Sequence, residues 1–238
     1  MLTKKIKRTL SKVADFFSKR LPDQNIKKSK KKWNKLASEN ARYYVVSRKG
    51  RDINEDEFKE SGKENYVQYV ASDPLLKGKL VSFSDKTVLN IGCGVGRLEE
   101  FFATDFRNVH GVDISGEMVA RARKRLAQQS NVQFQETNGI SLPFPDNFFD
   151  FVFSYLVFQH MPSRAVVEKN LLEVFRVLKP GMMAKIQVRG GHTPFKWQWF
   201  YGPSWNKEQA LALVTKIGFR VLKMEGEGTK RFWIWLEK

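Results

Sequence analysis

The chain has 238 residues and carries 42 Lys and Arg against 25 Asp and Glu, which gives a formal net charge of +17 at pH 7. This length suits one α/β domain with an extension, and a hydrophobic content of 42% can form a sizeable core. The single cysteine, Cys93, excludes an internal disulfide and a zinc site built from cysteines. We expect neither a secretory signal nor a membrane-spanning helix, because no apolar run is long enough, and therefore a cytoplasmic location.

The positive charge is concentrated at the N-terminus. Residues 1–35 contain 13 Lys and Arg but only two acidic residues, so +11 of the net charge lies there. Apolar residues spaced by three and four predict an amphipathic helix over residues 3–21, and residues 27–32 form a lysine-rich run. We interpret residues 1–32 as a basic arm that makes peripheral contact with an anionic membrane. The alternatives are a nucleic-acid-binding arm and a helix that packs on the domain itself, and for the lysine-rich run a solvated linker.

Residues 33–80 combine aromatic clusters with a helical pattern. Trp33 and the run of residues 43–46 precede a predicted helix over residues 55–72, whose apolar positions include Phe58. We expect this segment to form a helical lid over a site on the domain that follows. The alternative is that its aromatic side chains cover the edge of the sheet, and the sequence does not decide between the two.

A strand that runs into a glycine-rich turn organises the rest of the chain. Residues 87–91 read as a buried strand, followed by Gly92, Gly94 and Gly96 and by a helix over residues 97–104. Glycine allows a ligand to approach the main chain closely. The helix directs its free N–H groups into the same space, so the pattern indicates a ligand-binding turn.

Asp113 ends a second short strand, predicted over residues 109–112. In a βαβ unit its carboxylate lies beside the glycine turn, where it can accept hydrogen bonds from ribose hydroxyls. Capping of the next helix is the alternative role. The glycine spacing is Gly-x-Gly-x-Gly, which differs from the Gly-x-Gly-x-x-Gly of dinucleotide enzymes.

Helices and strands alternate along the remaining chain. In chain order we predict a helix from Ser115 to Leu126, strands over 132–135 and 150–154, a helix from Ser163 that stops at Lys179-Pro180-Gly181, a strand over 184–188, a helix from Asn206 to Gly218, and strands over 219–224 and 231–236. Such alternation predicts an α/β fold with a mainly parallel, doubly wound sheet.

The motifs, taken together and in this order, resemble those of one enzyme family. The glycine turn and Asp113 are followed by Asn138-Gly139, by residues 142–146 and by residues 177–181. This set resembles the class I S-adenosylmethionine-dependent methyltransferases, and is similar to the methyltransferase-type-11 group with its quinone-biosynthesis-like members. The resemblance implies S-adenosylmethionine as cofactor and a seven-stranded Rossmann-like sheet over residues 81–238. It also implies the strand order 3-2-1-4-5-7-6 with an antiparallel seventh strand.

The resemblance further implies roles for individual residues. The residues implied in cofactor binding are Gly92, Cys93, Gly94, Gly96, Arg97, Asp113, Ile114, Met118, Asn138, Gly139, Ser154 and Tyr155. Asp113 is assigned to the ribose hydroxyls and Ile114 and Met118 to the adenine, although Met118 equally suits plain helix packing. Asn138 stands where family members often have an acidic residue, and its side-chain oxygen can still accept a hydrogen bond.

His160 is the candidate catalytic residue. It follows the strand predicted over residues 150–154, and histidine side chains titrate near neutral pH, which suits a general base. A histidine that orders the loop or contacts the cofactor is the alternative. His110 is expected to be structural and His192 receives no role. The three histidines are too scattered for a metal site, so no metal is expected.

The acceptor is the least determined feature. Residue 154 is not followed by the Asn/Asp-Pro-Pro-Tyr/Phe motif of enzymes that methylate base amino groups. The aromatic loop of residues 189–205 is expected to face the acceptor or to pack onto the lid. We predict methyl transfer to a small molecule, a lipid-linked sugar or a quinone-like acceptor, with oxygen preferred over carbon as the methylated atom. An RNA or protein methyltransferase that uses the basic arm, and a noncatalytic binding module, are the alternatives.

Overall fold

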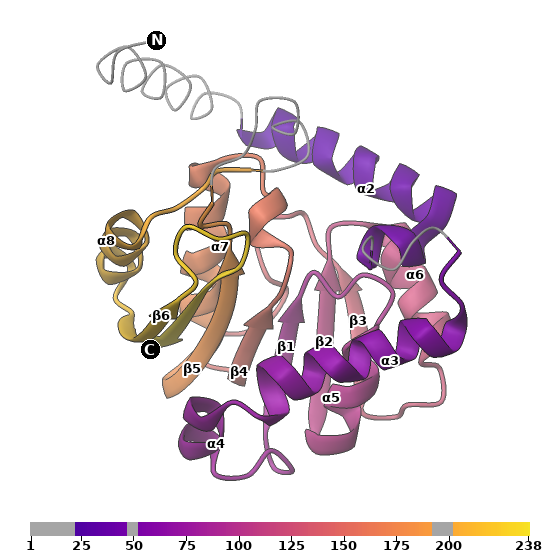
Figure 1. The fold of residues 1–238 in the computed structure, drawn as a ribbon, viewed down its shortest axis with the longest axis horizontal. Coiled ribbons are helices and arrows are strands. Elements are labelled where there is room, and N and C mark those ends of the chain that lie inside the picture. Colours follow the sequence, from indigo (N-terminus) through magenta and orange to yellow (C-terminus); the bar gives the residue numbers. More distant parts are fainter. Residues whose placement is uncertain (1–21, 47–51, 192–201) are drawn as a thin grey trace.

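The computed structural model of the protein describes residues 22–46, 52–191 and 202–238, which form a sheet with helices on both faces (Figure 1). The strands are β1 (Thr87–Ile91), β2 (Asn108–Asp113), β3 (Val132–Glu136), β4 (Phe149–Ser154), β5 (Leu178–Val188), β6 (Arg220–Glu225) and β7 (Phe232–Glu237). The helices are α2 (Pro22–Val45), α3 (Glu55–Tyr66), α4 (Pro74–Leu80), α5 (Glu99–Asp105), α6 (Gly116–Arg125), α7 (Arg164–Val177) and α8 (Lys207–Ile217). A π-helix, η2 (Val67–Ala71), and a 3-10 turn, η3 (Phe158–His160), complete the elements.

The seven strands lie in the order β3-β2-β1-β4-β5-β7-β6, and β7 runs antiparallel to both of its neighbours. This confirms the predicted fold class and strand order. From β1 the chain first builds outward through β2 and β3, and then crosses to β4 on the other side of β1. Such a reversal leaves a crevice at the carboxyl ends of the strands, between the first and fourth strands.

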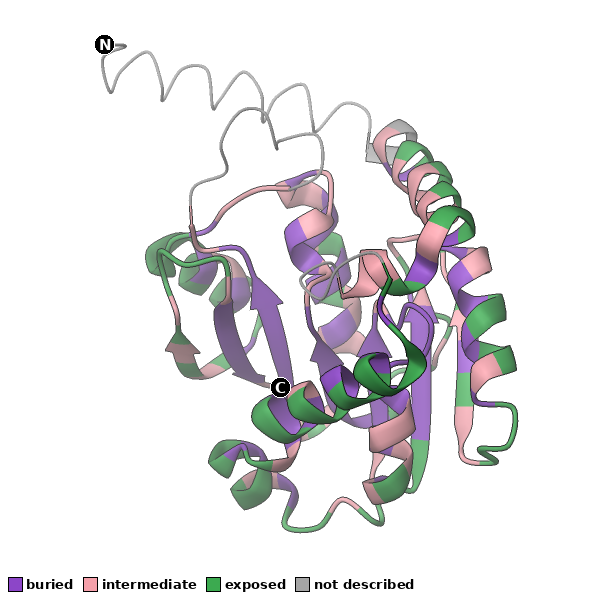
Figure 2. Cartoon of the chain, turned by 45° about the vertical axis from the view of Figure 1, so that its right-hand side comes forward, coloured by how far each residue is buried: buried purple, intermediate pink, exposed green. Residues whose placement is uncertain are grey.

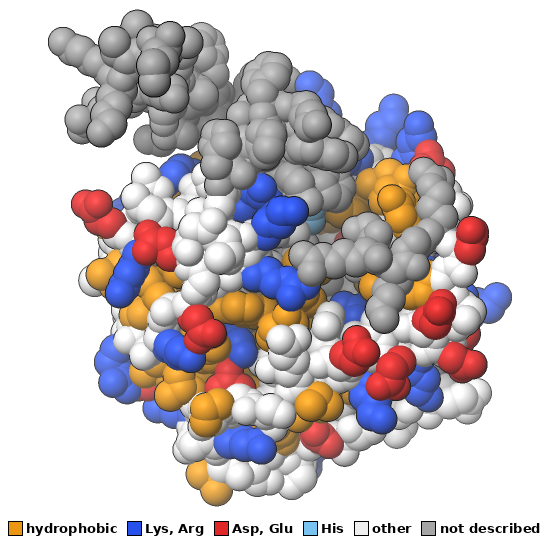
Figure 3. All heavy atoms as spheres, viewed as in Figure 1, with side chains coloured by type: hydrophobic (Ala, Val, Ile, Leu, Met, Phe, Trp, Pro, Cys, Tyr) orange, Lys and Arg blue, Asp and Glu red, His pale blue; other side chains and the backbone are white. Residues whose placement is uncertain are grey.

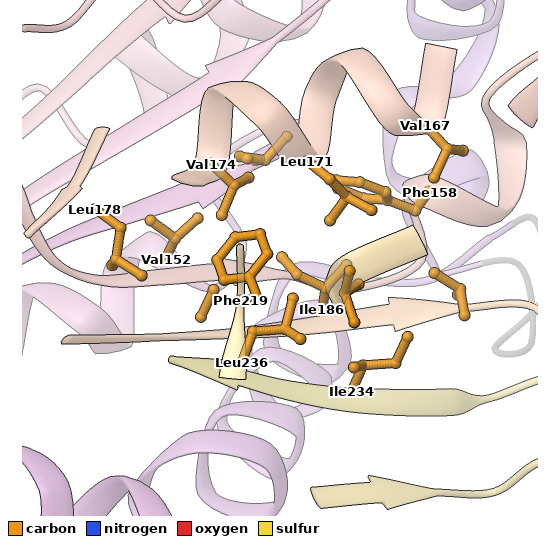
Figure 4. Packing of buried hydrophobic residues seen from close by; sticks show 14 of the residues in the cluster. Val152, Phe158, Val167, Leu171, Val174, Leu178, Ile186, Phe219, Ile234 and Leu236 are labelled. Atoms are coloured by element: carbon orange, nitrogen blue, oxygen red, sulfur yellow. The ribbon is translucent and has the colours of Figure 1, made fainter. Parts of the chain in front are cut away.

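Alternate residues of the central strands enter two separate cores, because successive side chains of a strand point to opposite faces. Val88, Phe153 and Trp233 pack on the face covered by α3, η2, α4 and α5. Leu89 and Val152 pack on the opposite face with α7 and α8 (Figure 4). The strands are therefore largely buried, while the outward sides of the helices are exposed (Figure 2). A mainly parallel sheet is expected to be covered in this way on both faces.

The helix ends follow the capping signals read from the sequence. Ser115 and Ser163 are the N-caps of α6 and α7, and each accepts a hydrogen bond through Oγ from the third backbone N–H of its helix. Asn206 and Gln209 form a complete capping box at the start of α8. The same helix ends at Gly218, whose backbone is left-handed (φ 114°).

Strand β5 begins earlier than predicted. Helix α7 ends at Val177, as the Pro-Gly stop signal indicates, but Leu178 already pairs with Phe149 of β4. The strand predicted over residues 184–188 thus starts six residues earlier. A register shift in the β4–β5 pairing accommodates the Pro-Gly stretch, because proline is tolerated in a sheet at such irregularities.

Helix α2 contains the lysine-rich run of residues 27–32, so these residues do not form a linker. The helix is kinked at Asn40, and Ile26 in its first part is buried. The boundary predicted between residues 32 and 33 therefore falls inside a helix. The amphipathic helix predicted over residues 3–21 lies outside the described residues. None of the described helices combines the length and the apolarity that crossing a membrane requires.

The aromatic residues of the predicted helix over residues 55–72 cover the sheet. Tyr66 packs against Phe101 and Phe102 of α5, with ring centroids 6.3 Å and 5.3 Å away. Tyr69, in the π-helix, packs 4.8 Å from Trp233 of β7. These aromatic residues thus pack on one face of the sheet rather than along its edge.

A buried ion pair fastens these helices to the sheet. Lys185 of β5 donates to Asp73 Oδ2 (2.7 Å) and to the carbonyl oxygen of Tyr69 (2.6 Å), and Trp235 Nε1 donates to the same carboxylate oxygen (2.7 Å). Lys185 and Asp73 are only 3% and 5% exposed. Removing one partner of such a pair leaves an uncompensated buried charge, so the contact fixes where η2 and α4 lie.

Candidate functional site

A cavity of about 540 Å³ opens at the carboxyl ends of β1, β2, β4 and β5. Its walls include the glycine turn after β1, Asp113 at the end of β2, the loop after β4, and residues of α2 and α3. Ligands bind at this edge of open α/β sheets. The volume lies in the range of small-molecule sites, so this cavity is the candidate active site.

The glycine turn forms the floor of the cavity. Gly92 has a left-handed backbone (φ 79°), and a Cβ atom there would lie 2.0 Å from Cγ2 of Val157. The N–H groups of Gly92 and Cys93 both donate to the carbonyl oxygen of Val112 (2.7 Å and 3.0 Å), which joins the turn to β2. Only glycine can occupy position 92 without displacing the loop after β4.

Asp113 is held by two backbone donors. The N–H of Gly94 donates to Oδ2 (3.0 Å) and the N–H of Ser115 donates to Oδ1 (2.9 Å). Burial raises the pKa of Asp113, and these hydrogen bonds oppose that shift. Each carboxylate oxygen has two lone pairs, so the group retains capacity to accept further hydrogen bonds from a ligand.

The apolar part of the cavity lies between Asp113 and helix α2. Ile114, Met118 and Gly139 line it as predicted, together with Ile26 of α2. Helix α2 is fastened over this part of the cavity, because Ser115 Oγ donates to Asn34 Oδ1 (2.7 Å). Helix α2, which extends past residue 32, thus packs against this part of the cavity.

Three of the residues predicted to bind the cofactor do not line the cavity. A side chain at Gly96 would meet an aromatic ring of β3 at 3.1 Å, so this glycine serves packing. Asn138 is exposed, and its Oδ1 accepts hydrogen bonds from two backbone N–H groups of its own turn. Ser154 is fully buried and donates through Oγ to the carbonyl oxygen of Ile91 (2.9 Å). We therefore assign them no direct cofactor contact.

Arg97 and Cys93 line the cavity, as predicted, and are almost completely buried. Arg97 donates to the carbonyl oxygen of Ser61 (2.7 Å) and to Asn65 Oδ1 (3.1 Å), which joins α3 to the glycine turn. Burial lowers the pKa of Arg97 to about 10 and raises the pKa of the Cys93 thiol. Arg97 is thus a structural cation that positions the wall formed by α3.

A buried pair beneath the turn was not predicted. Asn90 of β1 lines the cavity, and its Nδ2 donates to Oε1 of Glu99 (2.7 Å). Glu99 is completely buried in the first turn of α5, and its Oε2 has no hydrogen-bond partner among the described residues. Burial raises the pKa of Glu99 to about 7.

His160 lines the cavity at the end of η3. Its Nε2 lies 3.0 Å from Nε2 of Gln159, and its ring meets the indole of Trp33 edge-on, with centroids 5.5 Å apart. Tyr155, another predicted cavity residue, stacks on Trp233 at 5.5 Å. Burial raises the pKa of Tyr155, which keeps its hydroxyl neutral.

The other histidines do not contribute to the cavity among the described residues. His110 of β2 packs against the rings of Phe144, Phe148 and Phe149, and burial lowers its pKa. This agrees with the predicted structural role. His192 lies outside the described residues. Within the described part of the chain, no group of three His, Cys, Asp or Glu side chains could hold a metal ion.

The loop predicted over residues 189–205 is described only at its two ends. Arg189 lines the cavity, whereas Trp205 is 4% exposed and packs in the core, with the guanidinium of Arg164 4.4 Å from its ring. Further cavity residues that we did not predict are Ser61, Glu64, Asn65, Gln159, Lys230 and Arg231. They come from elements far apart in the sequence.

Comparison with known proteins supports the interpretation of this cavity. Residues 89–184 match the Methyltransf_11 family, described as a methyltransferase domain. The chain is 41% identical to 2-methyl-6-phytyl-1,4-hydroquinone methyltransferase of Synechocystis, over 40% of this chain and 29% of that protein. It is 30% identical to demethylmenaquinone methyltransferase of Lactiplantibacillus plantarum, over 50% of this chain and 53% of that one. The chain spans less than two thirds of the length of these curated relatives.

Solved structures share the fold. A SAM-dependent methyltransferase from Aquifex aeolicus superimposes with a TM-score of 0.55 at 22% identity, covering 78% of this chain and 98% of that one. The PH0226 protein from Pyrococcus horikoshii gives a TM-score of 0.60 at 25% identity, covering 78% and 93%. The fold of this chain is thus found in several solved structures.

The buried carboxyl of Glu99 predicts a pH dependence of stability. Because its pKa is about 7 in the folded state and its ordinary value is 4.5, the folded chain binds more protons than the unfolded chain between these values. Stability should therefore fall as pH rises through this window, by up to about 3 kcal/mol from this group. Glu99→Gln should lose this dependence and be more stable than the parent at pH 8.

Urea unfolding at pH 5, 6, 7 and 8 measures this effect. Glu117→Gln is the matched control, because Glu117 forms only an exposed pair with Arg121 on α6. Parallel stability curves for the parent and Glu99→Gln across the four pH values would contradict the assignment.

Proposed function

Residues 89–184 form a class I S-adenosylmethionine-dependent methyltransferase domain, and from this premise we propose that the protein transfers the methyl group of that cofactor to a small-molecule acceptor. The observation that supports this most directly is the Asp113 carboxylate, which lies beside the glycine turn in the one cavity that both share. The alternative is a noncatalytic binding module. Such a module would need this turn and this carboxylate only if it, too, bound the cofactor.

The residues of the cavity fit this cofactor. Asp113 keeps acceptor capacity for two ribose hydroxyls, and Ile114 and Met118 offer apolar surface to the adenine ring. Gly92 and Gly94 leave room for the amino-acid end of the cofactor against the main chain. The cofactor supplies an activated methyl group on its sulfonium. The protein therefore contributes chiefly by positioning the acceptor.

His160 is the proposed general base. It lines the cavity, and the contacts with Gln159 and Trp33 orient its ring. A hydroxyl acceptor must lose its proton as its oxygen takes the methyl group, and a neutral imidazole can accept that proton. Because helix α2 supplies Trp33, the helix both closes the cavity and fixes the base.

The acceptor class follows from the relatives. Two of them are named as methyltransferases of a hydroquinone and of demethylmenaquinone, and a third, from Aspergillus sclerotiorum, is named an O-methyltransferase. We propose a quinone-like or phenolic acceptor, with a lipid-linked sugar as the second class. The name of the third relative supports oxygen as the preferred methylated atom, and carbon is the alternative. Methyl transfer from labelled S-adenosylmethionine to a panel of hydroquinones, phenols and sugars tests the proposal directly.

An acceptor of this class with an apolar part also gives the basic N-terminus a role. The sequence pattern of residues 3–21 is typical of an interfacial helix, which combines buried apolar area with attraction to anionic lipids. We propose that it holds the enzyme at an anionic membrane surface, where such acceptors are concentrated. The alternative partners of a basic arm are RNA or protein substrates. The same binding test distinguishes them from a membrane.

Asp113→Ala should weaken the binding of S-adenosylmethionine. The change removes hydrogen bonds between a carboxylate and the ribose that are worth about 1.5–3 kcal/mol, so the affinity should fall at least roughly tenfold. Isothermal titration calorimetry measures this, and Asp113→Asn, which retains an acceptor oxygen, should lose less. Equal cofactor affinity in all three proteins would exclude the ribose role of Asp113.

His160→Ala should lower kcat strongly and leave the affinity for the cofactor nearly unchanged, because the side chain acts only on the acceptor proton. The activity of the parent enzyme should also fall at acid pH, where a protonated imidazole cannot act as a base. Steady-state rates at saturating acceptor test both statements. An unchanged kcat would exclude the base role and indicate that His160 orders the loop.

Deleting residues 1–21 should abolish co-sedimentation with anionic vesicles and retain cofactor binding. The truncation stops before α2, because Ile26 of that helix is buried and lines the cavity. Vesicles of neutral lipid are the control, and added salt should weaken the interaction. If the full chain does not bind anionic vesicles at low salt but binds RNA, the membrane proposal is wrong. The alternative of a nucleic-acid-binding arm then gains support.

A further inference from the structure

The acidic residues that line the cavity lie on one side of it, and three of its four Arg and Lys residues lie on the other. The fourth, Arg97, is buried on the side of α3, where it donates to Ser61 and Asn65. The acidic ones, Glu64 and Asp113, lie on the side of α3 and β2. Arg189, Lys230 and Arg231 lie on the side of β5 and β7, where no Asp or Glu of the described residues lines the cavity. Figure 3 shows Lys and Arg side chains gathered near the centre of one face, beside a histidine. One end of the cavity is therefore cationic.

The sheet brings the arginines together. Val188, the last residue of β5, pairs in antiparallel register with Phe232, the first residue of β7. Arg189 and Arg231 are the next residues outward on these neighbouring strands, so they stand at the same edge of the sheet. The segment before β7 is held there, because Gln187 Nε2 donates to the carbonyl oxygen of Lys230 (3.0 Å).

The environment of Arg231 suits an anionic ligand. One terminal nitrogen donates to the hydroxyl of Tyr69 (2.7 Å), and the guanidinium lies 5.6 Å from the ring centroid of Tyr155. Its Nε is buried and has no hydrogen-bond partner among the described residues. Arg189 beside it is only 3% exposed. Two guanidinium groups in one partly enclosed space match the geometry of a carboxylate or phosphate.

The topology separates this cationic end from the cofactor residues. In the sheet, β5 lies two strands from β1 and three strands from β2, and β7 lies one strand further. With neighbouring strands about 4.8 Å apart, the backbone of the two arginines is roughly 10–14 Å from the glycine turn and further from Asp113, and the side chain of Arg231 reaches back to Tyr155 after β4. An anion at Arg189 and Arg231 is thus a different group from the one that Asp113 holds.

We infer that the acceptor carries an anionic group, a carboxylate or a phosphate, which Arg189 and Arg231 bind while the rest of the acceptor lies near His160. This inference rests on the proposed methyltransferase function and extends it to the charge of the substrate. The anion anchors the acceptor at one end of the cavity, so that the reacting atom is presented toward the cofactor side. Arg231 is in this sense a residue that determines acceptor specificity.

The experiment uses the full chain saturated with S-adenosylhomocysteine, titrated by calorimetry with 4-hydroxybenzoate, phenyl phosphate and the neutral methyl 4-hydroxybenzoate. At least one anionic probe should bind about tenfold or more tightly than the neutral ester, and the better of the two identifies a carboxylate or a phosphate site. Arg231→Gln should remove this preference and leave the affinity for the ester unchanged. Arg121→Gln, an equal charge change on the exposed face of α6, is the matched control and should retain the preference.

Three results would overturn the inference. The first is an anion affinity no greater than that of the ester, or undetectable at millimolar concentration. The second is an unchanged preference in Arg231→Gln. The third is an Arg231→Gln variant that binds S-adenosylhomocysteine more weakly but 5′-methylthioadenosine equally well, because the arginine would then hold the carboxylate of the cofactor. A different result would show that the proposed function itself is wrong: the parent protein would then not bind S-adenosylhomocysteine.

Discussion

The hydrogen bonds that Asp113 accepts from the backbone N–H groups of Gly94 and Ser115 join the parts of the site. They connect the turn after β1, the end of β2 and the first turn of α6 at a single carboxylate. Ser115 extends the connection to helix α2 through Asn34. Because the carboxylate is half-buried, the loss of either donor would leave it poorly compensated. The floor and the cover of the cavity therefore depend on one another, although they come from segments about 80 residues apart.

Buried polar contacts also determine where the helices of the N-terminal half lie. The pair of Lys185 and Asp73 fastens η2 and α4 to β5, and Arg97 fastens α3 to the glycine turn. Apolar packing alone tolerates sliding of a helix over a sheet, whereas a buried charge is stable only with its partner in place. These contacts place the polar face of α3 at the cavity, and the aromatic face over the sheet. The two interpretations of this segment, lid and sheet cover, thus describe two faces of one element.

Local sequence signals predicted most of the helices and strands of the fold. The glycine turn, the serine caps of α6 and α7 and the capping box of α8 lie within a few residues of what they specify, so the sequence alone predicts them. The strand order was predicted from the family resemblance, whereas several individual contacts between distant segments were not predicted. Pro180 ends a helix by local rules, but the pairing of Leu178 with Phe149 already makes that stretch a strand. The contact of Asn90 with Glu99, the packing role of Gly96 and the approach of Arg231 to the cavity depend likewise on tertiary structure.

The two halves of the cavity have separate origins in the chain, which bears on how such a protein can evolve. The glycine turn, Asp113 and Gly139 lie within the segment that matches the family, residues 89–184. Trp33 precedes that segment, and Arg189, Lys230 and Arg231 follow it. Under the proposed function, changes in the flanking stretches can thus alter acceptor preference while the glycine turn and Asp113 stay unchanged. If duplicated copies of such a protein diverged in substrate preference, their sequence differences would then concentrate before residue 89 and after residue 184.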